Sequence, residues 1–153
     1  MIVRMGDFAN PKVLALLREH LAEMQTNSPP GSVYALDVER LQSKDITFYS
    51  VWDSEGEAVM AIGALKELDT ATGEIKSMRT AQEHLRKGAA AFLLELFITK
   101  ARQCGYQHLC LETGSGPTFE PALSLYRRYG FENCEPFGDY EASAFNQFLQ
   151  LQV

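Results

Sequence analysis

Apolar residues recur at the three- and four-residue spacing of amphipathic helices in several parts of the chain. Asn10 and Pro11 are a favourable N-cap and first helical residue for the first of these segments. The segment before Gly105 has the clearest periodicity, and that glycine is suited to end a helix. The predicted helices are 11–26, a short one at 37–41, 88–104 and 121–129.

Other segments are rich in β-branched and aromatic residues and are separated by turn-forming residues. The predicted strands are 2–5, 46–52, 57–68, 74–80, 108–112 and 145–153. The turn Asp53–Gly56 predicts an antiparallel hairpin between the second and third of them. Antiparallel strands followed by a strand–helix–strand–helix unit indicate an α+β or mixed α/β sheet with helices on its faces. No repeat or linker interrupts the pattern, so we expect one domain over residues 1–153.

The composition is that of a soluble globular protein, with a formal net charge of -6 and a pI near 5.1. An acidic surface repels phosphate backbones, so nucleic acid is not an expected partner. No apolar run is long enough to span a membrane, and the first residues lack the features of a signal peptide, which predicts a cytoplasmic protein. Three cysteines without a paired spacing favour reduced, mostly buried thiols over a disulfide or a metal site.

Leu85–Ala91 precedes the most regular helix and has the composition of an anion site. The first amides of a helix have no intrahelical partner, and Gly88 with the alanines after it lets a phosphate approach them closely. Arg86 and Lys87 add positive charge. The run matches neither a P-loop nor a dinucleotide fingerprint. On these residues alone, an ordinary helix start that packs its alanines on the sheet is an equal alternative.

Two motifs resemble signatures of the GCN5-related N-acetyltransferase (GNAT) superfamily. The first is the strand Glu74–Thr80, the turn L-R-K-G-A-A at 85–90 and the long helix, similar to the family's [Q/R]xxGx[G/A] motif. The second is A-L-S-L-Y-R-R-Y-G-F at 122–131, which follows at the usual separation. The residues E-I-K-S-M-R-T, H-L-R-K-G and L-E-T-G-S, with the loop Ser28–Asp37, are similar to a subgroup of small bacterial acetyltransferases. Leu85 departs from the family pattern, and Ala90 is an accepted variant.

The resemblance implies a GNAT fold, in which a central, mostly antiparallel sheet splays between its fourth and fifth strands and helices cover both faces. It also implies an N-acetyltransferase that uses acetyl-CoA, with the cofactor's pyrophosphate on the backbone amides of the turn and its pantetheine arm in the splay. The amide of Met78 would polarise the acetyl carbonyl. The cofactor-binding residues expected on this basis are Met78, Thr80, Leu85, Arg86, Lys87, Gly88, Ala89, Ala90, Ala91 and Tyr126.

Tyr126 matches the family's tyrosine that donates a proton to the CoA thiolate, although an aromatic residue packed in the core is the alternative. A phenol stays protonated at neutral pH and is suited to that role. Glu112 is our first candidate for the base that deprotonates the amine. Glu74 and His84 are further candidates, and a structural role fits each of the three equally well.

The acceptor pocket is expected between the first helix and the ends of the central strands, with Ser28, Tyr34, Arg79 and Phe119 as candidate residues. Arg79 could bind a substrate carboxylate, as an amino acid would require, or form a surface ion pair. Phe119 occupies a position where many relatives have Asn, so a cofactor contact from that Asn is missing. We expect a primary amine of a small metabolite as the acceptor. A protein amine and a non-catalytic CoA-binding module are alternatives, and a homodimer is common in the family.

Overall fold

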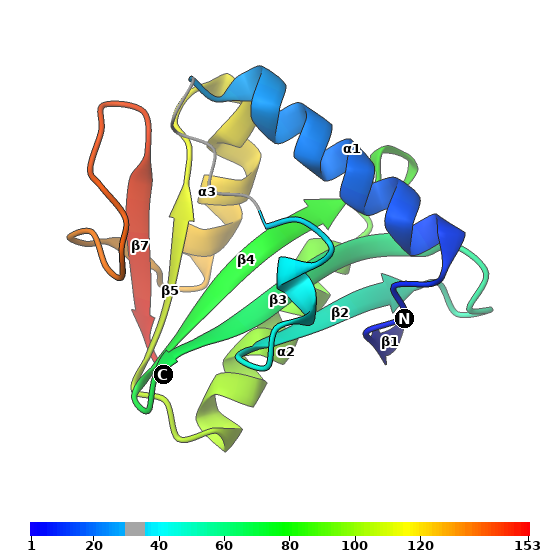
Figure 1. The fold of residues 1–153 in the computed structure, drawn as a ribbon, viewed down its shortest axis with the longest axis horizontal. Helices are drawn as coiled ribbons and strands as arrows, with labels where there is room; N and C mark the ends of the chain where they lie inside the picture. Colours follow the sequence, from blue (N-terminus) through cyan, green and yellow to red (C-terminus); the bar gives the residue numbers. More distant parts are fainter. Residues whose placement is uncertain (30–35) are drawn as a thin grey trace.

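The computed structural model describes residues 1–29 and 36–153, which form a twisted sheet flanked by helices (Figure 1). The strands are β1 (Ile2–Met5), β2 (Ile46–Trp52), β3 (Val59–Asp69), β4 (Thr72–Thr80), β5 (His108–Thr113), β6 (Glu132–Asn133) and β7 (Gln147–Gln152). The α-helices are α1 (Pro11–Asn27), α2 (Ala89–Gln103) and α3 (Glu120–Arg128), and 3₁₀ turns occur at Arg40–Gln42, Gln82–His84 and Pro117–Phe119.

The seven strands lie in the order β1-β2-β3-β4-β5-β7-β6, and all neighbours are antiparallel except β4 and β5. Those two are parallel and pair only over Thr72–Ile75 and His108–Leu111. β5 continues to pair with β7 as far as Thr113, so β4 and β5 diverge beyond Ile75 (Figure 1). The expected sheet, splayed between its fourth and fifth strands, is confirmed.

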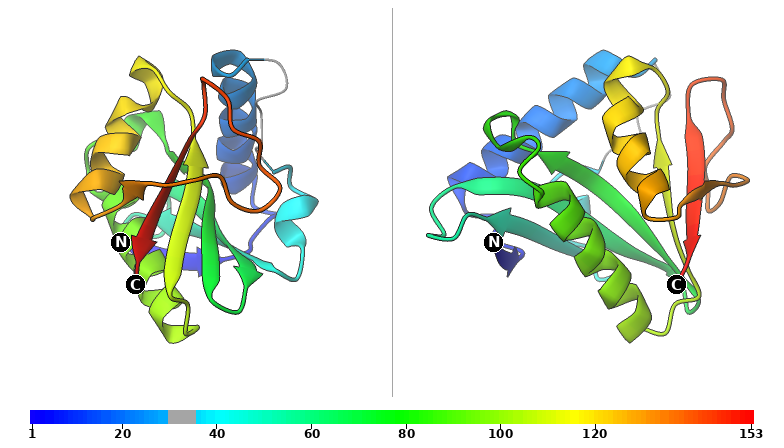
Figure 2. Two further views of the ribbon diagram at one scale, coloured as in Figure 1. Left: turned by 90° about the vertical axis from the view of Figure 1, so that its left-hand side faces the viewer. Right: turned by 180° about the vertical axis from the view of Figure 1, so that it is seen from behind.

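Helices cover both faces of the sheet, as Figure 2 shows from two sides. On one face α1 packs Val13, Leu16 and Leu17 against the core residues of β2 and β3. On the other face α2 and α3 bury a larger cluster that contains Leu93, Phe97 and Leu123. The expected apolar stripe of α2 is therefore largely correct, except that Cys104 at its end is exposed. Of the three thiols only Cys110 is buried, which corrects the expectation of mostly buried cysteines.

Local sequence signals explain most of the element boundaries. The Asn10 side chain accepts a hydrogen bond from the Lys12 amide at 3.0 Å and caps α1, as predicted. The predicted hairpin is confirmed by the antiparallel pairing of β2 with β3. The predicted tail strand is shorter, Gln147–Gln152, and the two-residue strand β6 has no periodic pattern that could predict it.

A β-bulge interrupts β4 where it passes β3. Ile62 lies opposite Arg79 and Ala64 opposite Lys76, so Ser77 and Met78 together face the single residue Gly63. Ser77 has a left-handed backbone with φ +57°, which is unusual for a residue other than glycine. Directly opposed residues of an antiparallel pair share one face of the sheet. Ile62 and Ala64 belong to the α1 face, so the bulge places both Lys76 and Arg79 on that face.

Candidate active site

A cavity of about 250 Å³ opens where β4 and β5 diverge. Its lining residues come from α1, from both diverging strands, from the start of α3 and from the β6–β7 connection. The α1 side is polar and contains most of the cavity's ionisable residues. The side toward α3 is largely apolar, with Met78, Phe119, Ala122 and Tyr126. The cavity thus joins two chemically different compartments across the sheet.

Arg79 is held against α1 by two side chains. Its Nη1 forms an ion pair with Glu23, and its Nε donates to His20 Nδ1 at 3.1 Å. His20 is buried, and this burial together with the Arg79 charge lowers its pKa to about 4, so it is neutral at pH 7 and can accept that bond. The predicted ion pair of Arg79 therefore exists, but at a cavity wall and not on the open surface.

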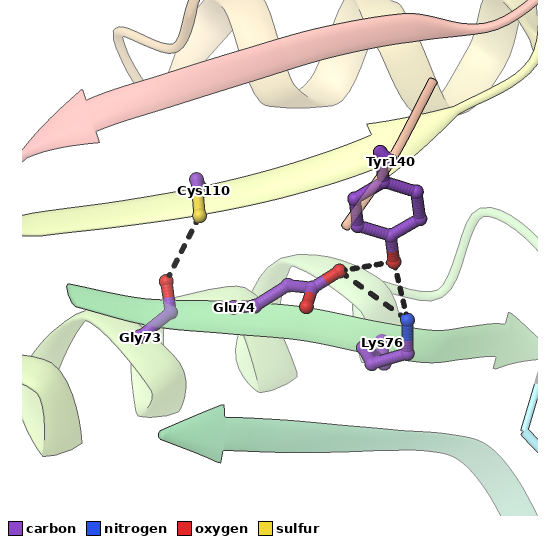
Figure 3. Close-up of polar contacts among 5 residues, drawn as sticks. All are labelled: Gly73, Glu74, Lys76, Cys110 and Tyr140. Atoms are coloured by element: carbon purple, nitrogen blue, oxygen red, sulfur yellow. Dashed lines mark hydrogen bonds and ion pairs between the residues drawn. The ribbon is translucent and has the colours of Figure 1, made fainter. Parts of the chain in front are cut away.

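Glu74, Lys76 and Tyr140 form a polar cluster in which Glu74 is buried and the other two residues are half-buried (Figure 3). The Tyr140 hydroxyl donates to Glu74 Oε2 at 2.5 Å, and the Lys76 ammonium donates to the same oxygen at 3.3 Å and to the Tyr140 oxygen. Burial and the neighbouring Glu74 carboxylate raise the pKa of Tyr140, which therefore stays protonated. The aromatic rings of Phe137 and Phe148 pack edge-on against Tyr140 and fix it in place.

Glu112 lies on β5 between Leu111 and Thr113 and lines the cavity. Burial raises its pKa from 4.5 to about 7, although the Lys76 charge and a hydrogen bond with Asn146 act in the opposite direction. A carboxyl group of this pKa exchanges a proton readily at neutral pH, which a general base requires.

Tyr126 lies on α3 with only 7 % of its surface exposed. Its hydroxyl lies 3.8 Å from Met78 Sδ. A thioether sulfur is a weak acceptor, so this hydrogen bond of the buried hydroxyl is weak. Burial raises the pKa of Tyr126 to about 12. The neighbouring Phe119 is buried against Phe145, with their ring centroids 5.5 Å apart.

Ser77, in the bulge, also lines the cavity, and its hydroxyl is buried with no hydrogen-bond partner in the described parts of the chain. A buried hydroxyl without a partner is costly unless a ligand or a water satisfies it. A β-bulge also leaves one residue of the ladder unpaired. The bulge therefore gives the cavity polar groups that a bound molecule can use.

The turn before α2 exposes its backbone. Arg86 and Gly88 both have left-handed backbones, with φ +62° and +87°, and residues Leu85–Gly88 are exposed. The first helical hydrogen bond runs from Phe92 N to Gly88 O. The amides of Ala89–Ala91 consequently have no intrahelical acceptor, and no group in residues 1–29 and 36–153 accepts from them. Such a run of free amides binds anions.

The predicted site residues divide into two places. Ser28, Glu74, Met78, Arg79, Glu112, Phe119 and Tyr126 line the cavity. Leu85–Ala91 form the separate turn, and His84 lies beside it, with Nδ1 3.3 Å from Lys87 Nζ. Thr80 pairs with Ala61 and is not a cavity residue, and Tyr34 lies outside the described residues.

Sequence reasoning did not assign a role to several residues of the cavity. Lys76 had a usable signal, because it is two positions from Glu74 on one strand and so shares its face. The other lining residues without an assigned role include His20, Glu23, Ser77 and Tyr140, and Asn146, outside the lining, was missed as the hydrogen-bond partner of Glu112. Tyr140 has no such signal, since it reaches Glu74 from 66 positions away through an irregular connection.

Comparison with known proteins shows the family of the chain. The profile of the acetyltransferase (GNAT) family matches residues 14–131. The chain is 50 % identical over the full length of both chains to the uncharacterized N-acetyltransferase YsnE of Bacillus subtilis (strain 168). It is 43 % identical to the uncharacterized N-acetyltransferase YedL of Escherichia coli (strain K12), over 99 % of this chain and 94 % of that one.

Solved structures have the same fold. An acyl-CoA N-acyltransferase of Klebsiella pneumoniae superposes with a TM-score of 0.80 at 23 % identity, covering 99 % of this chain and 96 % of the other. An aminoglycoside 6'-N-acetyltransferase complexed with coenzyme A gives 0.73 at 11 % identity, covering 99 % and 97 %. In the described residues no helix has the length and apolarity needed to cross a bilayer. The family profile and the two full-length relatives show that the chain belongs to the acetyltransferase (GNAT) family and is an N-acetyltransferase.

Proposed function

We propose that the chain transfers the acetyl group of acetyl-CoA to a primary amine of a small metabolite by direct attack on the thioester. The observation that carries this proposal is the cavity between β4 and β5, where Glu112 and Tyr126 line one continuous space from opposite sides of the sheet. Family membership and the coenzyme A bound to the aminoglycoside acetyltransferase support the choice of cofactor.

The residues present fit a CoA molecule. The amides of Ala89–Ala91 would hold its pyrophosphate, and Gly88 leaves open space above them, because an added Cβ would meet only the Met1 side chain at 3.8 Å. The unpartnered Ser77 hydroxyl and the interrupted ladder at Met78 offer polar contacts inside the splay. Acetyl-CoA supplies the acetyl group as a thioester, and every other role falls to side chains and amides of the chain.

Tyr126 and the Met78 amide act on the acyl group. An N–H of Met78 directed at the carbonyl oxygen stabilises the negative charge that develops there. Tyr126 donates a hydrogen bond to the leaving sulfur. Its pKa of about 12 exceeds the value near 8.5 of an alkyl thiol, so this phenol holds its own proton more firmly than the thiol does. We therefore assign to Tyr126 mainly hydrogen-bond stabilisation of the leaving thiolate, which refines the role expected from its motif.

Glu112 is the base that we favour. Its pKa of about 7 leaves about half of the carboxyl groups ionised at neutral pH and ready to accept a proton from the ammonium group of the acceptor, which frees the neutral amine for attack. Glu74 is less suited, because Oε2 of its carboxylate already accepts from both Tyr140 and Lys76. His84 does not line the cavity and lies beside the turn before α2. Formation of the amide removes a second proton from the nitrogen, and this proton balances the one gained by the departing thiolate. The proton held by Glu112 passes to solvent.

The shape of the cavity supports a small acceptor. Its volume of about 250 Å³ is bounded by α1, β4, β5, α3 and the β6–β7 connection, so a compact molecule can be surrounded, whereas a folded protein surface cannot enter. A protein amine on a flexible terminus is the competing acceptor, and the same assay distinguishes the two.

The test uses the purified chain, acetyl-CoA and a panel of free amino acids, amino acid amides, simple alkylamines and unstructured peptides, with acetylated products identified by mass spectrometry. We expect products from small amines and at least ten-fold lower kcat/KM for peptides. A preference for peptides would contradict the proposed acceptor class. The absence of product with every amine would contradict the proposed activity. Glu55→Gln, an exposed substitution away from the cavity, is the matched control for Glu112→Gln.

A further inference from the structure

Two cations lie on either side of the bulge at which the acetyl group would be held. Lys76 precedes Ser77 and Met78, and Arg79 follows them, and both belong to the α1 face because they oppose Ala64 and Ile62. In a strand paired residue for residue, Lys76 and Arg79 would lie on opposite faces, because they are three positions apart and side chains alternate along a strand. The bulge therefore places two positive groups beside the position of the acceptor amine.

Each cation has a fixed position and N–H groups to spare. Lys76 has three donors, of which Glu74 and Tyr140 take two. Arg79 has five, of which Nε bonds to His20 and Nη1 to Glu23. No acceptor for the remaining donors exists in the described residues. Buried or half-buried N–H groups of this kind favour a ligand that accepts hydrogen bonds.

The acids that neutralise these cations also line the cavity, and each is paired with its own cation. The Glu74 side chain is 2 % exposed, less than the 9 % of Lys76, and its carboxylate lies beside the Lys76 ammonium in Figure 3. The Glu23 side chain is 44 % exposed, so it lies at the outer rim, whereas that of Arg79 is 15 % exposed. Glu74 and Glu23 are thus engaged with Lys76 and Arg79, and the half-ionised Glu112 on β5 is the third carboxyl group among the residues that line the cavity.

We propose that Lys76 and Arg79 bind a carboxylate of the acceptor, so that the substrate class is an amine that also carries a carboxylate, as amino acids do. The amine lies toward Glu112 and the carboxylate toward β4, where charge-assisted hydrogen bonds are the strong ones. Glu74 and Tyr140 are positioning residues, because they hold the Lys76 ammonium without reaching the acceptor. This proposal rests on the proposed function and commits it to one chemical class.

The experiment compares each amino acid of the panel with its own C-terminal amide, which keeps the amine and the side chain and removes only the negative charge. We expect the wild-type chain to acetylate at least one acid with a kcat/KM at least ten-fold above that of its amide. Lys76→Gln should lower kcat/KM for the acid about 10- to 100-fold, the loss typical of a hydrogen bond between charged groups, and for the amide less than about three-fold. The loss should appear mainly in KM, since the bond exists before and during the reaction.

Tyr140→Phe tests the positioning role and keeps the ring packing on Phe137 and Phe148. It should raise KM for the acid several-fold and leave KM for the amide unchanged, a split that a general loss of structure would not produce. Arg79→Gln is the second variant in case Lys76→Gln does not fold, and the same split is expected for it. Lys44→Gln removes the same charge at an exposed position outside the cavity and should change kcat/KM for neither the acid nor the amide.

This proposal would be overturned if the amides had the same kcat/KM as their acids. It would also be overturned if Lys76→Gln and Arg79→Gln lowered kcat/KM equally for acid and amide. Both results would leave the proposed function intact. Failure to acetylate any amine would overturn the proposed function as well. Acetylation of amino acids with the expected split supports both.

Discussion

Replacing Glu112 by Gln should strongly lower activity and, above pH 7, increase stability. The pKa of Glu112 is raised from 4.5 to about 7 chiefly by burial, so the folded chain resists ionisation of this group. The stability it contributes is complete below pH 4.5 and is lost as the pH rises toward 7. A pKa change from 4.5 to about 7 corresponds to about 3 kcal/mol in the free energy of unfolding, because a pKa difference of one is worth about 1.4 kcal/mol.

The measurement is the free energy of unfolding in urea at several values between pH 4 and pH 9 for the wild-type chain, Glu112→Gln and the control Glu55→Gln. Gln resembles the protonated form and does not ionise. The difference between Glu112→Gln and wild type should therefore grow by about 3 kcal/mol in favour of the variant, with most of the change between pH 4.5 and pH 7. The altered contact with Asn146 adds an offset that does not vary with pH.

The kinetic counterpart is the pH profile of kcat/KM. In the wild-type chain it should rise with pH and level off near pH 7 as Glu112 ionises, and in Glu112→Gln that inflection should be absent. A stability difference that does not vary with pH would show that the Glu112 pKa is not raised. An unchanged inflection in the variant would assign it to another group and remove Glu112 from the role of base.

Three other substitutions test separate parts of the site and fold. Gly88→Val should weaken CoA binding and lower the free energy of unfolding by about 1–2 kcal/mol, because the residue has φ +87°. An unchanged Kd in calorimetry would mean that the pyrophosphate site is wrongly placed. Tyr126→Phe should lower kcat about 10- to 100-fold with little effect on Tm, since within residues 1–29 and 36–153 its hydroxyl forms only the weak bond to Met78. An unchanged turnover number would exclude Tyr126 from the mechanism. Gly63→Ala should lower the free energy of unfolding by about 1–3 kcal/mol, because its Cβ would lie 2.8 Å from the Leu93 side chain, and full stability in thermal unfolding would refute this overpacking.

Local patterns predicted the elements but not the contacts between them. The Asn10 cap, the hairpin of β2 and β3, and the limits of α2 within a residue or two follow from spacing and turn residues alone. The cavity itself was predicted through the family resemblance, which placed the splay between β4 and β5. Periodicity could not have located it, because a parallel pair that separates has the same alternation as one that stays paired.

The partners of the site residues were beyond the sequence. The helical pattern places Glu23 on the polar side of α1, yet its carboxylate forms an ion pair with Arg79 at the rim of the cavity. Tyr140 lies in a connection without regular structure, so neither helical nor strand spacing predicts its bond to Glu74. Such contacts depend on which distant segments lie side by side in the fold, and the residue types alone do not predict this.

The bulge in β4 makes the site sensitive to the number of residues and not only to their kind. Deleting Ser77 would remove the extra residue, so that Met78 alone would oppose Gly63 and side chains would alternate regularly along the strand. Lys76 and Arg79 would keep their partners Ala64 and Ile62 and their shared face. The left-handed backbone at position 77 and its buried hydroxyl would be lost from the cavity wall. We therefore expect this deletion to leave the two cations beside α1 and to alter the part of β4 that would contact the acyl group.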